Sequence, residues 1–139
     1  MSGVAAQRTL NYLAFDYGQR RVGVATGNSF TRQAQALRTV AAEGEARFEQ
    51  IGKLIKEWQP DALVIGVPFH PDGQPHENTL RARKFGRQLH GRFGLPVHEV
   101  DERYSTTEAH AHGARDLDAA SAAILLQQYF NAQAPQSQP

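Results

Sequence analysis

The sequence predicts a single α/β domain whose sheet contains both antiparallel and parallel strands. Residues 12–15 and 22–26 are short runs of aromatic, β-branched and small residues, and the polar segment between them has hairpin length, which favours a β-hairpin. A continuous apolar run at residues 62–66 follows an amphipathic helical pattern and predicts a central strand reached by a parallel crossover. The 139 residues suffice for one hydrophobic core.

Composition excludes several classes of protein. The chain has no cysteine, which excludes a disulfide scaffold and a thiolate zinc site. It has no apolar run of signal-peptide or membrane-span length, so we expect a cytoplasmic protein with no membrane contact. A net charge of +1 does not by itself indicate a nucleic-acid binder, although a nearly neutral chain can carry a basic face. We expect a flexible segment at 1–10, one domain at 11–131 and a disordered tail at 132–139.

The first half of the chain continues with a strand, a helix and a loop. Residues 34–40 have a weak alternating pattern, which suits an edge strand. From Glu43, apolar residues recur at three- and four-residue spacing until Pro60 ends the predicted helix. The proline-rich segment 67–75 is predicted to be an irregular loop at the carboxyl end of the central strand, where ligand sites of α/β sheets are favoured.

The second half adds a strand and three helices. A helix is predicted from about Asn78 to Phe93. Its expected buried side consists of Leu80, Phe85, Leu89 and Phe93. A short strand at 97–100 ends at 101–103, and the capping-box pattern at 105–108 predicts a short helix to about residue 114. The last helix starts near Asp116 and is apolar around most of its circumference, so we expect it to pack deeply against the sheet.

Three acidic residues occupy comparable positions at the ends of these elements. Asp16 ends the first strand, Glu102 follows a later strand, and Asp118 lies in the first turn of the last helix. Carboxylates converging at one sheet edge would repel each other unless a cation lay among them. Oxygen ligands suit Mg²⁺ or Mn²⁺, and two such ions can activate a water and stabilise the leaving oxygen of a phosphodiester.

Other interpretations of these residues stay open at this point. Asp16 could instead only cap the turn that follows its strand. Asp116 is better explained as the N-cap of the last helix, and Asp101 could support Glu102 from beside it. His70 lies in the loop at the predicted active edge and could contact substrate. The histidines at 110 and 112 point to different sides of a predicted helix, which favours surface positions over a shared metal.

The helix at 78–93 carries many cations besides its apolar residues. They are Arg81, Arg83, Lys84, Arg87 and Arg92. Such a face can simply keep the helix solvated, or it can form a stripe that contacts phosphates.

Four segments of the sequence occur in a characteristic order and spacing. The first is Phe-Asp-Tyr-Gly at 15–18, with Arg-Val-Gly-Val-Ala at 21–25. The second is Ile-Gly-Val-Pro at 65–68, with Asp-Gly at 72–73. The third and fourth are Val-Asp-Glu-Arg-Tyr-Ser-Thr at 100–106 and the segment from Leu117 to Gln127. Together these segments resemble the YqgF/RuvX family of Holliday junction resolvases, which are also described as pre-16S rRNA nucleases.

This resemblance implies a ribonuclease H-like fold, with a mixed five-stranded sheet (three antiparallel strands, then parallel ones) flanked by helices. It also implies a metal-dependent nuclease in which Asp16, Glu102 and Asp118 are the catalytic and Mg²⁺- or Mn²⁺-binding residues. The substrate would be pre-rRNA or branched DNA. The residues expected to hold its backbone are Arg20, Arg21, Arg81, Lys84, Arg87 and Arg103.

The sequence departs from the family pattern at two places. Residues 26–28 lack the acidic residue expected after the second strand, and residues 110–115 lack the lysine-rich stretch that many relatives carry. Both departures concern nucleic-acid affinity and substrate geometry rather than the fold.

Two other functions remain as alternatives. The chain could be a nucleic-acid-binding factor for ribosome or DNA processing that does not cleave. The Asp-x-Gly hairpin also resembles the first phosphate loop of actin-like ATP phosphotransferases, but that fold needs two such domains. Junction cleavage would favour a homodimer, whereas trimming of an RNA end requires only a monomer.

Overall fold

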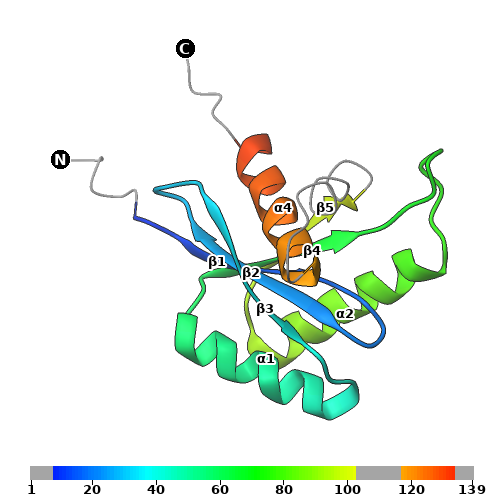
Figure 1. The fold of residues 1–139 in the computed structure, drawn as a ribbon, viewed down its shortest axis with the longest axis horizontal. Helices are drawn as coiled ribbons and strands as arrows, with labels where there is room; N and C mark the ends of the chain where they lie inside the picture. The colour runs from blue at the N-terminus through cyan, green and yellow to red at the C-terminus, as the bar shows by residue number, and fades with distance from the viewer. Residues whose placement is uncertain (1–7, 103–116, 134–139) are drawn as a thin grey trace.

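A computed structural model describes residues 8–102 and 117–133, and its centre is one five-stranded mixed sheet (Figure 1). The strands are β1 (Asn11–Asp16), β2 (Val22–Asn28), β3 (Ala34–Val40), β4 (Ala62–Val67) and β5 (Val97–Asp101). Their order across the sheet is β3-β2-β1-β4-β5. The predicted fold class is confirmed, with residues 34–40 forming an edge strand.

The pairing of the strands brings three strand ends to one edge of the sheet. The first three strands are antiparallel, and Asp16 at the end of β1 pairs with Gly23 near the start of β2. β4 runs parallel to β1, and β5 runs parallel to β4 with Val67 opposite Asp101. The carboxyl ends of β1, β4 and β5 therefore lie side by side, which is where the acidic residues were expected.

Helices cover both faces of the sheet (Figure 1). α1 (Gly44–Trp58) and α2 (Glu77–Phe93) pack on one face, over a core that includes Leu13, Phe15 and Ile65. α4 (Leu117–Ala132) packs on the other face, over Ala14 and Val64 among others. Adjacent residues of β1 and β4 alternate between the two cores, as the two-residue period of a strand requires.

The ends of α1 and α2 have clear local causes. α1 ends at Gln59, which adopts a left-handed conformation directly before Pro60. At the start of α2, His76 is the N-cap, and its ring accepts a hydrogen bond from the backbone N–H of Asn78. The backbone N–H of His76 in turn donates a hydrogen bond to the Thr79 hydroxyl. These contacts supply partners for backbone groups that a helix leaves free at its first turn.

The predicted buried side of α2 was wrong at Leu80, which is 64% exposed. The residues that α2 buries are Thr79, Ala82, Phe85, Gly86 and Leu89. Thr79 is buried because its hydroxyl donates a hydrogen bond to the Pro68 carbonyl. Position 79 therefore faces the protein and the next residue faces solvent.

Three glycines allow α4 to lie unusually close to the sheet. A Cβ atom at Gly23 of β2 would overlap the backbone carbonyl of Asp118, and one at Gly66 of β4 would lie 2.5 Å from Leu125. A Cβ at Gly27 would lie 2.9 Å from the ring of Phe130. Only a residue without a side chain permits these contacts, so the glycines determine how near Asp118 comes to the sheet edge.

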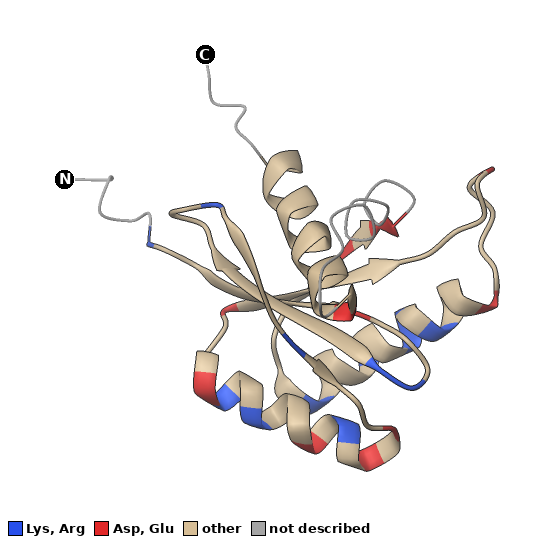
Figure 2. Ribbon diagram, in the orientation of Figure 1, with Lys and Arg blue, Asp and Glu red and all other residues tan. Residues whose placement is uncertain are grey.

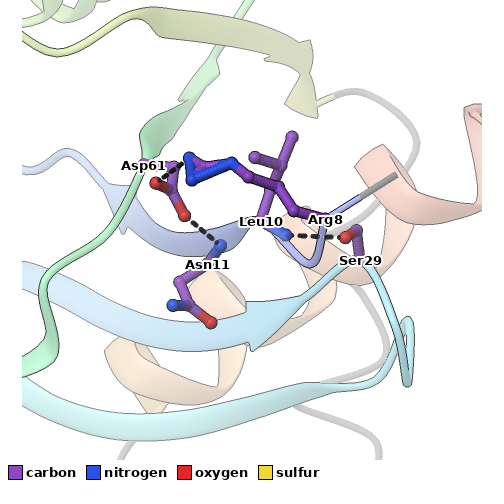
Figure 3. A network of polar contacts seen from close by, with 5 residues as sticks. All are labelled: Arg8, Leu10, Asn11, Ser29 and Asp61. Atoms are coloured by element: carbon purple, nitrogen blue, oxygen red, sulfur yellow. Dashed lines mark hydrogen bonds and ion pairs between the residues drawn. The ribbon is translucent and has the colours of Figure 1, made fainter. Parts of the chain in front are cut away.

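A small polar network connects the beginning of the described chain to the sheet (Figure 3). Arg8 pairs with Asp61 at 2.6 Å, and the other carboxylate oxygen of Asp61 accepts from the Asn11 backbone N–H. The backbone N–H of Leu10 donates to the Ser29 hydroxyl. Residues 8–10, which the sequence places in a flexible segment, are thus tied to the domain.

Some expectations concern residues outside the described ranges. They include residues 1–7, the short helix expected at 105–114 and the tail at 134–139. Within residues 8–102 and 117–133, no helix is both long and apolar enough to cross a bilayer.

We expect Gly23→Ala to destabilise the protein by about 3 kcal/mol, the upper part of the range for overpacked cores, because its methyl group would push α4 away. Gly91→Ala is the matched control, since a methyl group at this position of α2 would meet no atom within 4 Å. That control should stabilise the helix by about 0.5–1 kcal/mol. Urea unfolding of both variants measures the difference, and equal stabilities would contradict the close α4 contact.

Candidate active site

Asp16 and Glu102 face each other at the carboxyl edge of the sheet. Asp16 continues the set of β1 residues on the α4 side, which includes Tyr12 and Ala14. Glu102 directly follows β5, and one of its carboxylate oxygens would lie 2.5 Å from a Cβ at Gly66. The two carboxyl groups share a hydrogen bond. Gly66 is the position that leaves room for Glu102 to reach across β4 toward Asp16.

The pair is electrostatically strained in the absence of a cation. Burial, followed by the charge and hydrogen bond of Asp16 and by the charge of Asp101, raises the pKa of Glu102 to about 9. Burial also raises the pKa of Asp16; the charge of Asp118 adds to this, whereas the hydrogen bond with Glu102 acts in the opposite direction. Glu102 therefore keeps its proton at neutral pH and donates it in the hydrogen bond to Asp16.

Asp118 approaches this pair from α4, which packs on the same face of the sheet. It lies in the first turn of α4, and its carboxylate forms an ion pair with Arg21 Nε at 2.9 Å. Its charge acts on Asp16, so the three acidic residues form one electrostatic unit. As the side chains stand, no three His, Asp or Glu residues within the described ranges form a group that could hold one metal ion.

The loop between β1 and β2 separates two hollows beside the acidic residues. One hollow is lined by Arg20, Arg21 and Asp118, together with Gly18 and Gln19. The second is lined by Glu102 and Arg81, with Tyr17 to Gln19, Pro68 and Asn78. Each hollow thus contains one acidic residue and at least one arginine.

The basic residues of α2 do not form a single stripe. Arg81 and Lys84 line a hollow between α1 and α2, whereas Arg87 lines another one on the β5 side of α2. Each three-residue step turns a side chain by about 60° around a helix, which carries Arg87 about 120° away from Arg81. Figure 2 shows the basic residues of α2 approaching the basic β1–β2 loop, close to the acidic start of α4.

Arg47 is a residue of this region that the sequence reasoning missed. It is only 5% exposed, although it belongs to the polar-looking first turn of α1. Its guanidinium donates to the carbonyls of Ala42 and Gln19, both at 2.8 Å, and lies 5.6 Å from the ring centre of Tyr17. A lone arginine in an amphipathic helix gives no sequence signal for such a position.

Several other candidates are only partly covered by the structure. His70 and His76 have their rings 4.6 Å apart in the loop before α2, at the same end of β4 as Glu102. Arg103, Asp116 and the histidines at 110 and 112 lie outside the residues that the structure describes. Their expected roles remain predictions.

Comparisons with known proteins identify relatives over most of the chain. Residues 10–132 match the model of a family described as "RuvX: Holliday junction resolvase". A protein of Albidiferax ferrireducens named "Putative pre-16S rRNA nuclease" is 64% identical over 119 residues, covering 86% of this chain and 76% of its own. A protein of the same name from Polaromonas is 65% identical and covers 86% of each chain.

The same fold occurs in a solved structure of much lower sequence similarity. RuvC of Thermus thermophilus in complex with a Holliday junction superposes with a TM-score of 0.56 over 89% of this chain and 95% of its own. The identity is 14%, so this likeness concerns the fold alone.

The raised pKa of Glu102 predicts how stability depends on pH in protein treated with EDTA. Between pH 4.5 and about 9 the folded state holds a proton that the unfolded chain releases. Because the folded state then binds more protons, the free energy of unfolding should fall as pH rises through this window. Glu102→Gln removes the titrating carboxyl group and keeps a hydrogen-bond donor toward Asp16. The free energy of unfolding of this variant should therefore depend less on pH than that of the wild type.

Urea unfolding of both proteins at several pH values measures this effect. Glu99→Gln makes the same chemical change at an exposed position of β5 and is the matched control for the substitution itself. Identical pH dependence in the wild type and Glu102→Gln would contradict the buried proton.

Proposed function

Because the chain belongs to the RuvX family, we propose that it is a metal-dependent nuclease that hydrolyses phosphodiester bonds in structured nucleic acid. The observation that carries this proposal is the convergence of Asp16, Glu102 and Asp118 at one edge of the sheet. Buried carboxyl groups normally have partners of opposite charge. In this protein Asp16 and Glu102 share a proton, and the Asp118 carboxylate is paired with Arg21.

The donor chemistry of the three residues fits a hard divalent cation. All three offer carboxylate oxygens, the ligands that suit Mg²⁺ and Mn²⁺, and the proton on Glu102 indicates a place where positive charge is favourable. We propose that Asp16, Glu102 and Asp118 hold the ion or ions. Such ions supply an activated water and stabilise the charge that develops on the phosphodiester.

The protein's own side chains then orient the substrate. The proposed backbone contacts are Arg20 and Arg21 on the β1–β2 loop, Arg81 and Lys84 on α2, and Arg103 beyond β5. Arg21 has a second role in this proposal, because it holds the Asp118 carboxylate before substrate arrives. Arg87 is not among these contacts, because it lines the hollow on the other side of α2.

The favoured substrate is the 5′ end of pre-16S rRNA. This choice is supported by two relatives named as pre-16S rRNA nucleases, which are 64% and 65% identical to this chain and cover most of it. Trimming an RNA end requires only one active site, so a monomer suffices. The proposed reaction belongs to ribosome assembly in the cytoplasm.

The second candidate is resolution of a Holliday junction. The description of the family model favours it, and so does the RuvC-like fold. Cleavage of both strands of a junction would use a two-fold dimer. A non-cleaving binding factor is the remaining outcome, and a cleavage assay on both substrates distinguishes all three.

We expect the purified protein with Mn²⁺ or Mg²⁺ to cleave a pre-16S rRNA fragment more rapidly than a four-way DNA junction. Asp16→Asn should lower the rate at least 100-fold, because this residue lies at the centre of the acidic group proposed to hold the ion or ions that activate the water. Single-turnover assays on both substrates, with EDTA as the metal-free control, measure the rates. Binding without cleavage under every metal condition would favour the non-cleaving factor.

Asp118→Asn should also abolish cleavage while the free energy of unfolding stays within about 1 kcal/mol of the wild type. Its ion pair with Arg21 is accessible to solvent, with 65% of the Arg21 and 32% of the Asp118 side chain exposed, and such pairs contribute little to stability. The substitution also removes a negative charge close to Asp16. A thermal melt beside the activity assay tests both parts, and a large fall in Tm would instead assign Asp118 a structural role.

A further inference from the structure

The hollow between α1 and α2 combines three cations and three aromatic rings. Its volume is about 310 Å³, and Arg47, Arg81 and Lys84 line it beside Tyr17, Phe48 and Phe85. No acidic residue of the described ranges lines this hollow. A concave surface with one sign of charge attracts ligands of the opposite charge.

Arg47 is the most informative of the three cations. Buried arginines are ordinarily paired with a carboxylate, but within residues 8–102 and 117–133 no carboxylate forms an ion pair with Arg47. The nearby Glu45 is instead paired with Arg92, at 2.8 Å. Two backbone carbonyls and the Tyr17 ring orient the Arg47 guanidinium without neutralising it.

The other two cations surround the same space. Lys84 forms no ion pair with any residue that the structure describes, whereas Arg81 pairs with Glu77 at 2.9 Å on the helix surface. Gly44, the first residue of α1, also lines the hollow, and the side chain of the N-cap Glu43 does not bond to the first turn. The positive end of the α1 dipole therefore adds to the cationic character of the site.

We propose that this hollow is an anion site that binds a phosphate group through Arg47, Arg81 and Lys84. Guanidinium groups match phosphate oxygens with paired donors, and the lysine adds a mobile charge. The bound phosphate supplies the negative charge that the buried Arg47 lacks. The Tyr17 ring, packed between Arg47 and Phe85, forms one wall of the site.

The position of the hollow identifies the source of the phosphate. Tyr17 and Arg81 line both this hollow and the one that contains Glu102, and Tyr17 directly follows Asp16 in the sequence. A nucleic-acid backbone that passes the acidic residues would therefore continue into the anion site. This assignment to the substrate backbone rests on the proposed nuclease function, whereas phosphate binding itself does not.

Lys84→Gln is the main test, because this residue is outside the buried core and has no ion pair to lose among the residues that the structure describes. The matched control is Arg87→Gln, one helical turn further along α2 but in a different hollow. Binding of a pre-16S rRNA fragment is measured at several salt concentrations with Ca²⁺ in place of Mg²⁺. Lys84→Gln should reduce the slope of log affinity against log salt by about 0.7–0.9, the value for one phosphate contact, and Arg87→Gln should leave it unchanged.

A second measurement identifies the ligand without relying on cleavage. Amide NMR spectra of the wild type are recorded during titration with a dinucleotide and, separately, with inorganic phosphate. We expect the dinucleotide to shift the signals of Tyr17, Phe48 and Gln88, and we expect Lys84→Gln to abolish those shifts. Tighter binding of free phosphate than of the dinucleotide would overturn the assignment to a nucleic-acid backbone.

The two proposals fail in different ways. If the protein cleaves RNA but Lys84→Gln changes neither the salt slope nor the NMR shifts, the anion site is wrong and the nuclease function stands. If no metal supports cleavage but the dinucleotide still shifts the signals in a Lys84-dependent manner, the anion site stands and the nuclease function is wrong. Arg47→Met adds a direct test if its thermal melt shows a folded protein: retained binding would exclude Arg47 from the site.

Discussion

The close contact between the start of α4 and the sheet is the constraint on which the candidate site depends. Gly23 and Gly66 leave space on β2 and β4 that any side chain would fill. Without that space Asp118 would stand away from Asp16, and Glu102 could not reach across β4. Packing on one face of the sheet therefore determines the electrostatics at its edge. The raised pKa of Glu102 is a consequence of this geometry as much as of charge.

The opposite charges around this edge belong to different elements of the fold. The acidic residues converge at the strand ends, whereas the cations of the β1–β2 loop, α1 and α2 line hollows on either side of that loop. A polyanion can approach along the cations while the acidic residues stay available for the proposed metal ion. A nearly neutral chain can thus carry a strongly polarised surface, which its net charge does not reveal.

The sequence predicted the sheet, the helices that the structure describes, and the positions of Asp16, Glu102 and Asp118 at the ends of their elements, because each depends on local patterns. Alternation, apolar runs and Pro60 locate the elements, and strand ends locate Asp16 and Glu102. The exposure of Leu80 was not predictable in this way, since the bond between Thr79 and Pro68 sets the rotation of α2. Arg47 and the separation of Arg87 from Arg81 depend on which elements meet in space. Those contacts are tertiary, and no spacing within one helix encodes them.

The far end of α4 is fixed as firmly as its beginning. Gln127 accepts from the Ala34 backbone N–H and donates to the Arg32 carbonyl, while Arg32 donates to the carbonyl of Phe130. These bonds join the last turns of α4 to the β2–β3 connection and resist both sliding and rotation of the helix. The conformational entropy of positioning Asp118 is thus lost during folding rather than during substrate binding. Among the residues proposed to contact the substrate, the exposed side chain of Arg21 keeps the freedom to adjust, so the proposed recognition relies on preorganisation more than on induced fit.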